Sequence, residues 1–426
     1  MSPGSGWRLL SDPRLVSLAT QGLIVALTLF PAVAVARDLG PAGAGTYALG
    51  SRIAALTLSA SSLSLAHGIA QVATNRGAER AGQAWASGLC MCIPQGILAI
   101  MLALVATKAA SPHAPGEFTL LIVLAIPFQL ATLVGAHVLR GSMYVAEFNV
   151  QRLLQAIVWA AAFGVSWLHG SKTLTDIGIA WLLTQIVTSL WVCWRVARKV
   201  GVHRPKFHGS LSFGLRAHLG IVSRDASSYL DQLLIGVVAG TSSLGLYVPA
   251  SLLGSMVTLL ANNMALTMQP QIGRAEPGQV RSTVARLLRE GGIVTLPVAL
   301  VLALSAQYLV PAIYGDMFVL SGKISAGLCL AAGFDAILVL SIAALLGLDA
   351  PGIATLVQLG TTIGVTLGYG FVVSEFGIAV LGWVAPVIFG LAAVGGLCSV
   401  AWTLRRASDD EAPSQQVLLV GEGVNE

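Results

Sequence analysis

Five ionisable side chains lie within one apolar stretch, residues 213–240, that is long enough to cross a bilayer as a helix. They are Arg216, His218, Arg224, Asp225 and Asp231. A charge near the middle of a membrane costs about 2.5–3.5 kcal/mol on insertion scales, so such residues usually face a bundle interior or a water-filled cavity. On a helical wheel Arg216, Arg224 and Asp231 share one arc of about 100°. The stretch therefore predicts a helix with one wet face of mixed charge.

Two interpretations of this face are open. Arg224 and Asp231 can neutralise each other or neighbouring helices, which would be a structural role. Alternatively the face lines the path of a polar substrate, and we predict this role for Arg216, Arg224, Asp225 and Asp231. Arg224 and Asp231 lie two helical turns apart, so an anionic substrate could compete with the carboxylate for the guanidinium group.

Polar side chains also follow the second predicted span. Thr57, Ser61, Ser64 and Gln71 recur at helical spacing, with His67 beside them. Their hydroxyl groups can bind the hydroxyls of a sugar or join neighbouring helices, and the spacing does not decide between these roles. His67 fits either a proton-coupling step or a hydrogen-bonded packing position, and we include it among the cavity candidates.

A single carboxylate, Asp335, lies near the middle of the tenth predicted span. A carboxylate inside a membrane needs a basic partner, a proton or a bound ion. The sequence does not identify which of these Asp335 has. We therefore add Asp335 to the candidates for a cavity lining.

The composition excludes a soluble globular protein. The chain has 426 residues, 55% of them hydrophobic and 10% charged, whereas soluble domains contain roughly 25% charged residues. The net charge of +5 does not indicate a nucleic-acid partner, because most basic residues lie in short connections between apolar runs. The sequence contains no phosphate-binding glycine loop and no catalytic or metal-binding motif. We therefore expect a membrane protein that is not an enzyme and needs no cofactor or metal.

Apolar runs predict an all-α polytopic membrane protein with about twelve transmembrane helices. The predicted spans are residues 15–36, 47–74, 85–107, 118–139, 153–169, 177–195, 211–239, 248–271, 291–313, 323–346, 353–373 and 378–403. A basic connection at residues 195–210 separates the spans six and six. We therefore predict two six-helix bundles, residues 1–200 and 201–406, around a central cavity, and a disordered cytoplasmic tail at 407–426.

The distribution of basic residues predicts the orientation in the membrane. Few lysines and arginines fall on the side opposite the N-terminus: Arg37, Arg52, Lys108, Lys172 and Lys323. Because cytoplasmic loops carry the excess of these residues, both termini are predicted to be cytoplasmic. Several tryptophans lie at the ends of spans and are interpreted as interfacial anchors: Trp85, Trp167, Trp181, Trp194 and Trp402.

A weak internal repeat relates the two halves at an offset of 200 residues. The matching pairs are Gly40 and Gly240, Gly45 and Gly245, Tyr47 and Tyr247, and Gln71 and Gln271. Because each half has an even number of spans, the halves share one orientation and are expected to be related by a pseudo-two-fold axis along the membrane normal. This is the plan of an alternating-access transporter.

Two segments resemble a known family. They are RDLGPAGAGTYAL at residues 37–49 and SYLDQLLIGVVAGTSSLGLYVPA at residues 228–250. The turn that contains Leu-Gly-Pro, and the aspartate that precedes an apolar run and a Gly-x-Tyr, are similar to the polysaccharide flippases, the Wzx-type oligosaccharide transporters. That family belongs with the multidrug and toxin extrusion transporters and the lipid II flippase, which share two bundles of six helices.

The resemblance implies translocation of a polyprenyl-diphosphate-linked oligosaccharide across the bacterial inner membrane for O-antigen, capsule or exopolysaccharide biosynthesis, including lipopolysaccharide. It also implies membrane lipids, a polysaccharide polymerase and chain-length machinery as partners. Arginine binds phosphate oxygens through a planar fork of donors, so Arg52, Arg216 and Arg224 are the candidates for the diphosphate. Asp225 and Asp231 would oppose an anion unless they are paired or protonated.

Two other functions compete with this expectation. A cation-coupled multidrug exporter of the same superfamily would use carboxylates such as Asp231 and Asp335 to attract its substrates. A structural scaffold for polysaccharide-assembly enzymes would need no cavity residues. The identity of the sugar, the polymer and the coupling ion does not follow from the sequence.

Overall fold

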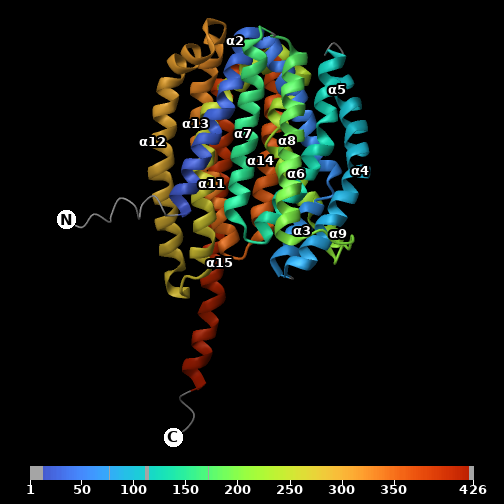
Figure 1. Cartoon of the computed structure of the whole chain (residues 1–426). Coiled ribbons are helices and arrows are strands. Elements are labelled where there is room, and N and C mark those ends of the chain that lie inside the picture. The colour runs from blue at the N-terminus through green and yellow to red at the C-terminus, as the bar shows by residue number, and fades with distance from the viewer. Residues whose placement is uncertain (1–12, 76, 111–114, 171, 422–426) are drawn as a thin grey trace, which may run out of the picture. The chain divides into compact units, whose positions relative to one another are not determined.

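The structure, a computed structural model, describes residues 13–75, 77–110, 115–170 and 172–421. Within those residues the chain forms α-helices and short 3₁₀ turns and no strand (Figure 1). The α-helices are α2 (Pro13–Ser61), α3 (Leu65–Asn75), α4 (Gly77–Ala110), α5 (Gly116–Leu124), α6 (Ile126–Gly141), α7 (Val145–Leu168), α8 (Leu174–Val200), α9 (Ser210–Ser227), α10 (Leu230–Val238), α11 (Gly240–Gly273), α12 (Val280–Tyr314), α13 (Val319–Gly347), α14 (Pro351–Phe376) and α15 (Leu381–Gly421). The 3₁₀ turns are η1 (Pro277–Gln279), η2 (Asp316–Phe318) and η3 (Ile378–Val380).

The helices agree with the predicted spans. Among the described residues, 9 helical segments are long and apolar enough to cross a membrane. One of them is α2, which Gly40 (φ 64°, ψ −173°) divides into two helices. With α2 divided, and with α7 and the pair α9 and α10 added, the segments follow the order of the twelve predicted spans. The predicted fold class, an all-α polytopic membrane protein, is confirmed.

The chain forms two compact units, Met1–Gly245 (unit 1) and Leu246–Glu426 (unit 2). Unit 1 therefore includes α9 and α10. The predicted division into two bundles at residue 200 is a different boundary and stays a prediction. Helix α15 continues to Gly421 and so extends into residues 407–426, for which we predict a disordered tail. The disorder of this tail stays a prediction.

In unit 1, close helix packing depends on glycine. Helix α3 packs on α4, α6 and α9, while α7 packs on α2 and α8, which lie side by side with it in Figure 1. A Cβ atom at Gly141 of α6 would lie 2.4 Å from the backbone oxygen of Ala70 on α3. At Gly68 of α3 it would lie 2.0 Å from the backbone oxygen of Ser210 on α9. The backbones of α3, α6 and α9 thus touch directly, which is how small residues join helices in membranes.

In unit 2, α13 is the central helix. It packs on α12, α14 and α15 and is buried along most of its length. At Gly327 of α13, a Cβ atom would lie 1.6 Å from the backbone oxygen of Gly382 on α15. Small and apolar residues therefore occupy the centre of this unit, as expected where helices associate by van der Waals packing.

The turns that the sequence repeat aligns contact each other reciprocally within unit 1. Gly40 and Gly240 both have positive φ, 64° and 83°, which glycine adopts without steric cost. A Cβ atom on Gly45 would lie 1.7 Å from the backbone oxygen of Thr241, and one on Gly245 would lie 1.7 Å from that of Pro41. The two contacts are related by the same offset of 200 residues, so the predicted repeat describes a local pseudo-two-fold contact.

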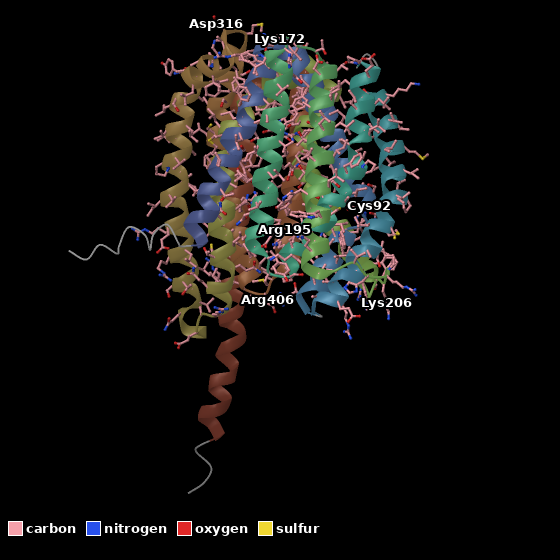
Figure 2. The ribbon with its side chains drawn as sticks, in the orientation of Figure 1. Cys92, Lys172, Arg195, Lys206, Asp316 and Arg406 are labelled. Carbon is pink, nitrogen blue, oxygen red and sulfur yellow. The ribbon has the colours of Figure 1, made fainter. Side chains whose placement is uncertain are left out.

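The labelled basic residues of unit 1 lie at the ends that the alternation predicts, and the orientation of the chain in the membrane stays a prediction. Within unit 1, Lys172 lies at the end opposite Arg195 and Lys206, and within unit 2 Asp316 lies at the end opposite Arg406 (Figure 2). Not every tryptophan behaves as predicted: Trp167, Trp194 and Trp402 are exposed, but Trp85 is buried. Trp181 is only partly exposed and packs edge-on against Trp159. The anchor interpretation is therefore wrong for Trp85, because its ring packs inside the unit.

Candidate functional site

Two predicted spans of unit 1 are broken within the membrane region. Residues Ser62–Ser64 separate α2 from α3, and Leu63 and Ser64 have positive φ, 49° and 48°. Residues Ser228 and Tyr229 separate α9 from α10. Sequence reasoning predicted spans in both places but no interruption of either.

Serine runs explain these breaks. Around the first, Ser62 Oγ donates to the backbone oxygen of Ser59 at 2.8 Å, and Ser62 Oγ in turn accepts from Ser64 N at 3.2 Å. Serine side chains compete with backbone groups for hydrogen bonds and so offer an alternative to the helical ladder. The sequence around the second break is also rich in serine, with Ser223, Ser227 and Ser228.

The broken backbone of α2 and α3 is covered by protein. The Ser62 carbonyl oxygen accepts from Leu65 N at 3.0 Å and from Nε2 of the buried Gln95 on α4 at 3.0 Å. A Cβ atom on Gly214 of α9 would lie 2.9 Å from the carbonyl oxygens of Leu63 and Ser64. Irregular backbone is tolerated at membrane depth only where it is buried in protein or lines a cavity.

A polar cluster joins the segments on either side of the two breaks. Ser59 Oγ donates to Asp225 Oδ2 at 2.7 Å, and Ser64 Oγ lies 3.1 Å from His218 Nδ1. Arg52 Nε donates to Gln232 Oε1 at 2.8 Å, and the Arg52 guanidinium lies 5.0 Å from the centre of the Tyr229 ring. The polar cluster is Arg52, Ser59, Ser64, His218, Asp225, Tyr229 and Gln232.

The spacing of these residues places them on matching faces. Arg52 and Ser59 lie seven residues apart on α2, and Asp225 and Gln232 lie seven residues apart across the break between α9 and α10. Seven residues make about two helical turns, so Arg52 and Ser59 share a face of α2. Asp225 and Gln232 lie on either side of the break, and their hydrogen bonds with Ser59 and Arg52 place both of them against this face. The cluster therefore presents a guanidinium group, a carboxylate, an imidazole and an amide between the same helices.

The structure brings together some of the predicted site residues. Arg52 and Asp225 belong to the polar cluster, and the partly buried Asp231 lies in the first turn of α10 next to Gln232. Arg224 lies in the last turn of α9, but its side chain is outside the described part of the chain. Arg216 is exposed and donates from Nε to the Ser212 backbone oxygen, 3.3 Å away, and from Nη2 to Ser212 Oγ, 3.2 Å away. Arg216 thus contacts its own helix rather than the cluster.

His67 lies with a second histidine that sequence reasoning did not single out. The ring centres of His67 on α3 and His137 on α6 are 4.6 Å apart. The His137 Nδ1 atom lies 2.9 Å from the backbone oxygen of Leu133. The contact between the two rings joins α3 to α6, and the place of His67 among the cavity residues stays a prediction.

Asp335 lies in unit 2, where it is partly buried on the unbroken helix α13. Its Oδ2 atom accepts a hydrogen bond from Thr258 Oγ1 of α11 at 3.2 Å. The hydroxyl group supplies one donor to the carboxylate. The structure therefore identifies a hydrogen-bond partner for Asp335 that the sequence could not.

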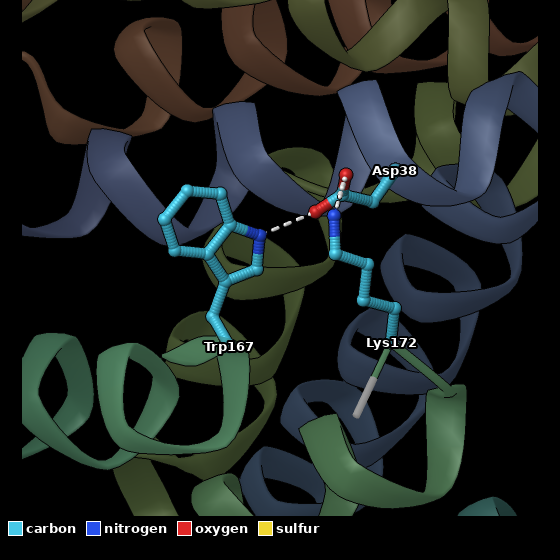
Figure 3. A network of polar contacts seen from close by, with 3 residues as sticks. All are labelled: Asp38, Trp167 and Lys172. Carbon is cyan, nitrogen blue, oxygen red and sulfur yellow. Dashed lines mark hydrogen bonds and ion pairs between the residues drawn. The ribbon is translucent and has the colours of Figure 1, made fainter. Parts of the chain in front are cut away.

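A separate network lies at the end of unit 1 that carries Lys172 (Figure 3). Trp167 Nε1 donates to Asp38 Oδ2 at 2.6 Å, and Lys172 Nζ lies 2.8 Å from Asp38 Oδ1. A small pocket beside it is lined by Ala34, Val35, Asp38, Leu39, Phe163, Ser166, Trp167, Lys172, Thr173, Asp176 and Ile177. Both oxygens of Asp38 have partners, so the network ties the end of the first span to the connection between α7 and α8.

The opposite end of the α7 and α8 pair carries a basic cluster. Lys199 Nζ lies 2.8 Å and Arg195 Nη2 3.5 Å from Glu147 Oε1, and the Lys199 ammonium group lies over the Tyr144 ring at 4.7 Å. The hydrogen bond from Lys199 is the main reason that the pKa of Glu147 is lowered from its ordinary value. The carboxylate is therefore held in its charged form between two cations.

Comparison with protein families identifies the chain. Residues 34–321 match the model of a family described as polysaccharide biosynthesis protein. The matched region begins in the first half of α2 and ends in α13, so it contains the polar cluster and both broken spans. The chain belongs to this polysaccharide biosynthesis family. The resemblance that the sequence predicted is confirmed at this level.

A characterised relative and two solved structures are similar to this member of the family. The probable low-salt glycan biosynthesis flippase Agl15 of Haloferax volcanii is 20% identical over 236 residues, 53% of this chain and 49% of that protein. The chain thus aligns with about half the length of this relative. An inward-facing multidrug resistance MATE family transporter of the MOP superfamily has a TM-score of 0.71 at 17% identity, with 91% of this chain and 95% of that chain covered. A MATE protein in complex with MaL6 has a TM-score of 0.63 at 16% identity, with 94% and 97% covered.

These structural similarities extend over nearly the whole chain, at identities that show the fold alone. The chain is thus a multi-pass membrane protein with the fold of a MATE-type transporter. Sequence reasoning missed several residues that build the site, namely Ser59, Gln95, His137, Tyr229 and Gln232. A signal existed for the two glutamines, because each is an uncharged polar residue inside an apolar run.

Proposed function

We propose that the protein is a flippase that moves polyprenyl-diphosphate-linked oligosaccharides across the bacterial inner membrane for surface polysaccharide biosynthesis. The family match, the transporter fold and the similarity to a probable glycan biosynthesis flippase of Haloferax volcanii support this function. Both termini lie in the cytoplasm in this proposal, so the lipid-linked substrate enters from the side that carries Arg195 and Lys206.

The observation that carries the proposal is the position of Arg52 among the broken helices of unit 1. Gln232 holds the Nε atom and Tyr229 covers one face of the guanidinium group. The two Nη groups are the part of the fork that can bind two phosphate oxygens at once. An arginine oriented in this way suits a diphosphate better than a flexible lysine would.

The other members of the polar cluster suit a sugar. Asp225 accepts from Ser59, so this carboxylate is already partly balanced by a hydroxyl donor and opposes an anion less than a bare charge would. Carboxylate, imidazole, hydroxyl and amide groups can all exchange hydrogen bonds with sugar hydroxyls. We assign Arg52 to the diphosphate and Asp225 and Ser64 to the first sugars.

Arg224 and Asp231 complete the proposal as a switch. In one state of the transport cycle Arg224 binds the diphosphate, and in the other it pairs with Asp231, because an arginine within a membrane span requires a partner in every state. His67 and Asp335 are the candidates for ion coupling. A polysaccharide polymerase and the machinery that sets chain length would receive the translocated unit.

The test is lipid flipping by the purified full-length protein in liposomes that contain a fluorescent polyprenyl-diphosphate oligosaccharide. We expect wild-type protein to expose the labelled lipid to an impermeant quencher, and Arg52→Lys to slow exposure at least roughly tenfold because a charged hydrogen bond of about 1.5–3 kcal/mol is lost. Lys108→Ala removes one exposed cation outside the polar cluster and should flip at the wild-type rate. Normal flipping by Arg52→Lys and Arg52→Ala would remove Arg52 from the site. Export of cationic drugs without any flipping would favour the exporter.

A further inference from the structure

The exposed face of α8 is an apolar stripe that ends in an aromatic residue and a cation. Its exposed residues follow one another at intervals of three or four: Ile179, Leu183, Val187, Leu190, Trp194 and Arg198. Residues at this spacing share one face of a helix. From first to last the stripe is about 28 Å long at the rise of an α-helix, close to the roughly 30 Å thickness of the hydrocarbon core. Arg198 therefore reaches the level of the lipid headgroups.

The charges around Arg198 are unbalanced. Arg195, Arg198 and Lys199 lie in the last two turns of α8, and Glu147 of α7 pairs with two of them, Arg195 and Lys199. Within the described part of the chain no carboxylate lies within ion-pair distance of Arg198, whose guanidinium group stacks 4.9 Å from the centre of the Trp194 ring. Trp194 itself is 49% exposed. Three cations thus share one carboxylate at the headgroup level.

The contact with Trp194 positions Arg198 for binding. The guanidinium carbon lies over the ring, and a guanidinium group held in this way still carries its N–H donors in its own plane, at its edge. Those donors fit the two oxygens of a phosphate group in a bidentate pair. Anionic headgroups concentrate at this depth, and the neighbouring apolar stripe offers a surface for an acyl chain.

We propose that the end of α8 binds the phosphate of an anionic phospholipid headgroup, with Arg198 as the bidentate donor, Trp194 as its stacking platform and the stripe from Ile179 to Leu190 as the contact for an acyl chain. This site is separate from the polar cluster and its occupation does not depend on the proposed transport function.

A second helix carries the same arrangement and supports this assignment independently. In unit 2 the exposed residues of α15 include Trp383, Val387, Leu391, Val394 and Trp402, whose positions share a face of the helix. The Arg406 guanidinium lies over the Trp402 ring at 5.6 Å, four residues along the helix as in α8. The last predicted span of each half therefore ends in the same pair. The α8 end adds Arg195 and Lys199, so we assign the tighter site to α8.

The experiment is native mass spectrometry of the full chain in detergent with added phosphatidylglycerol or phosphatidylcholine. We expect retained phosphatidylglycerol in wild-type protein, a roughly fivefold weaker retention in Arg198→Gln, and a smaller loss in Trp194→Leu, which keeps the charge. Raising the salt concentration should weaken retention in wild type more than in Arg198→Gln. Arg80→Gln is the matched control, since Arg80 is exposed near Gln83, whose backbone oxygen accepts from Lys206 N at the same end of unit 1.

Three results would overturn this assignment. Equal retention by wild type and Arg198→Gln would show that Arg198 does not bind the headgroup. An equal loss of phosphatidylglycerol retention in Arg198→Gln and Arg80→Gln would show that retention depends only on the overall positive charge at this end of unit 1. Displacement of phosphatidylglycerol by a polyprenyl diphosphate at equal concentration would assign the site to the transported lipid instead. Correct folding of each variant is checked by its thermal unfolding midpoint.

Discussion

The two units hold their buried polar groups in different ways. In unit 1 the polar cluster lies where α2 and α9 end and α3 and α10 begin. In unit 2, Asp335 and Thr258 lie on α13 and α11, which are continuous helices. At the repeat offset of 200 residues, three members of the cluster correspond to apolar residues of the second half: Arg52 to Leu252, Ser59 to Leu259 and Ser64 to Met264.

The two halves therefore share the glycine turns that support the fold, but they differ in the polar side chains that could bind a ligand. The halves share the glycine turns at Gly40 and Gly240, but the cluster has no counterpart at the equivalent positions of the second half. A helix break leaves backbone N–H and C=O groups without their helical hydrogen bonds. These groups and the neighbouring side chains can then bind a polar ligand. A continuous helix with one carboxylate suits a single proton or ion.

The largest loss of stability is expected from substitutions in the glycine turns that both halves share. Gly45→Ala and Gly245→Ala would each place a Cβ atom 1.7 Å from a backbone oxygen, and a backbone cannot move aside cheaply, so each should destabilise the protein by about 3 kcal/mol or more. The thermal unfolding midpoint in detergent measures this. Gly360→Ala is the control, because no described atom lies within 4 Å of its Cβ position. Unchanged midpoints for both variants would contradict the reciprocal contact.

The next effect concerns the chemistry that only the first half carries. Arg52→Leu gives the first half the residue of the second half at this position. We expect a fall in flipping of at least tenfold, on the order of the 1.5–3 kcal/mol of a charged hydrogen bond, without unfolding. Flipping in liposomes and the unfolding midpoint are measured on the same preparation. Retained flipping would show that the two halves are chemically equivalent here.

A smaller effect comes from comparing two hydroxyl–carboxylate pairs. Double-mutant cycles with Ser59→Ala and Asp225→Asn, and with Thr258→Ala and Asp335→Asn, measure the coupling energy in each unit. We expect about 1–2 kcal/mol for the first pair, whose atoms are 2.7 Å apart. The second pair, at 3.2 Å, should couple more weakly. A stronger coupling in unit 2 would reverse the contrast between the units.

The smallest effect is a pH dependence at the basic end of unit 1. Lys199 lowers the pKa of Glu147 in the folded protein, so this carboxylate stabilises the fold fully above its ordinary value of 4.5 and loses that contribution as the pH falls through the lowered pKa. Glu147→Gln should therefore reduce the free energy of unfolding near neutral pH by less than about 1 kcal/mol, as expected for partly exposed ion pairs. The thermal unfolding midpoint should fall accordingly. The difference should shrink below pH 4.5. A difference that grew on acidification would exclude the ion pair.

The sequence predicted the fold class well because a bilayer constrains it strongly. Every backbone amide in the hydrocarbon region must be bonded, so a long apolar run becomes a helix with few alternatives. The glycine turns were also predictable, because the offset of 200 residues aligned them before any coordinates were known. The boundary between the two units was harder to predict from the sequence. Helix α9 packs on α3 of the first unit, and the two helices are far apart in the sequence.

The site was only partly predictable. A charge inside the seventh span identified Asp225, and the resemblance to flippases identified Arg52. Their partners Ser59 and Gln232 are uncharged and lie more than 160 residues away in the chain. Helical periodicity placed Arg216 on the same face as Arg224, yet the guanidinium of Arg216 bonds to Ser212 one turn earlier on its own helix. A wheel assumes an unbroken helix, and the break at Ser228 changes the direction of everything after it.

The reciprocal contact of the glycine turns has a consequence for the origin of the chain. Gly45 meets the residue at position 241, and Gly245 meets the residue at position 41. When the same patch on two copies contacts itself in this way, the interface is isologous, the form found in symmetric dimers. The contact is therefore of the kind that two identical half-length chains make with each other, and joining two such chains end to end preserves it while the equivalent positions of each half become independent in sequence.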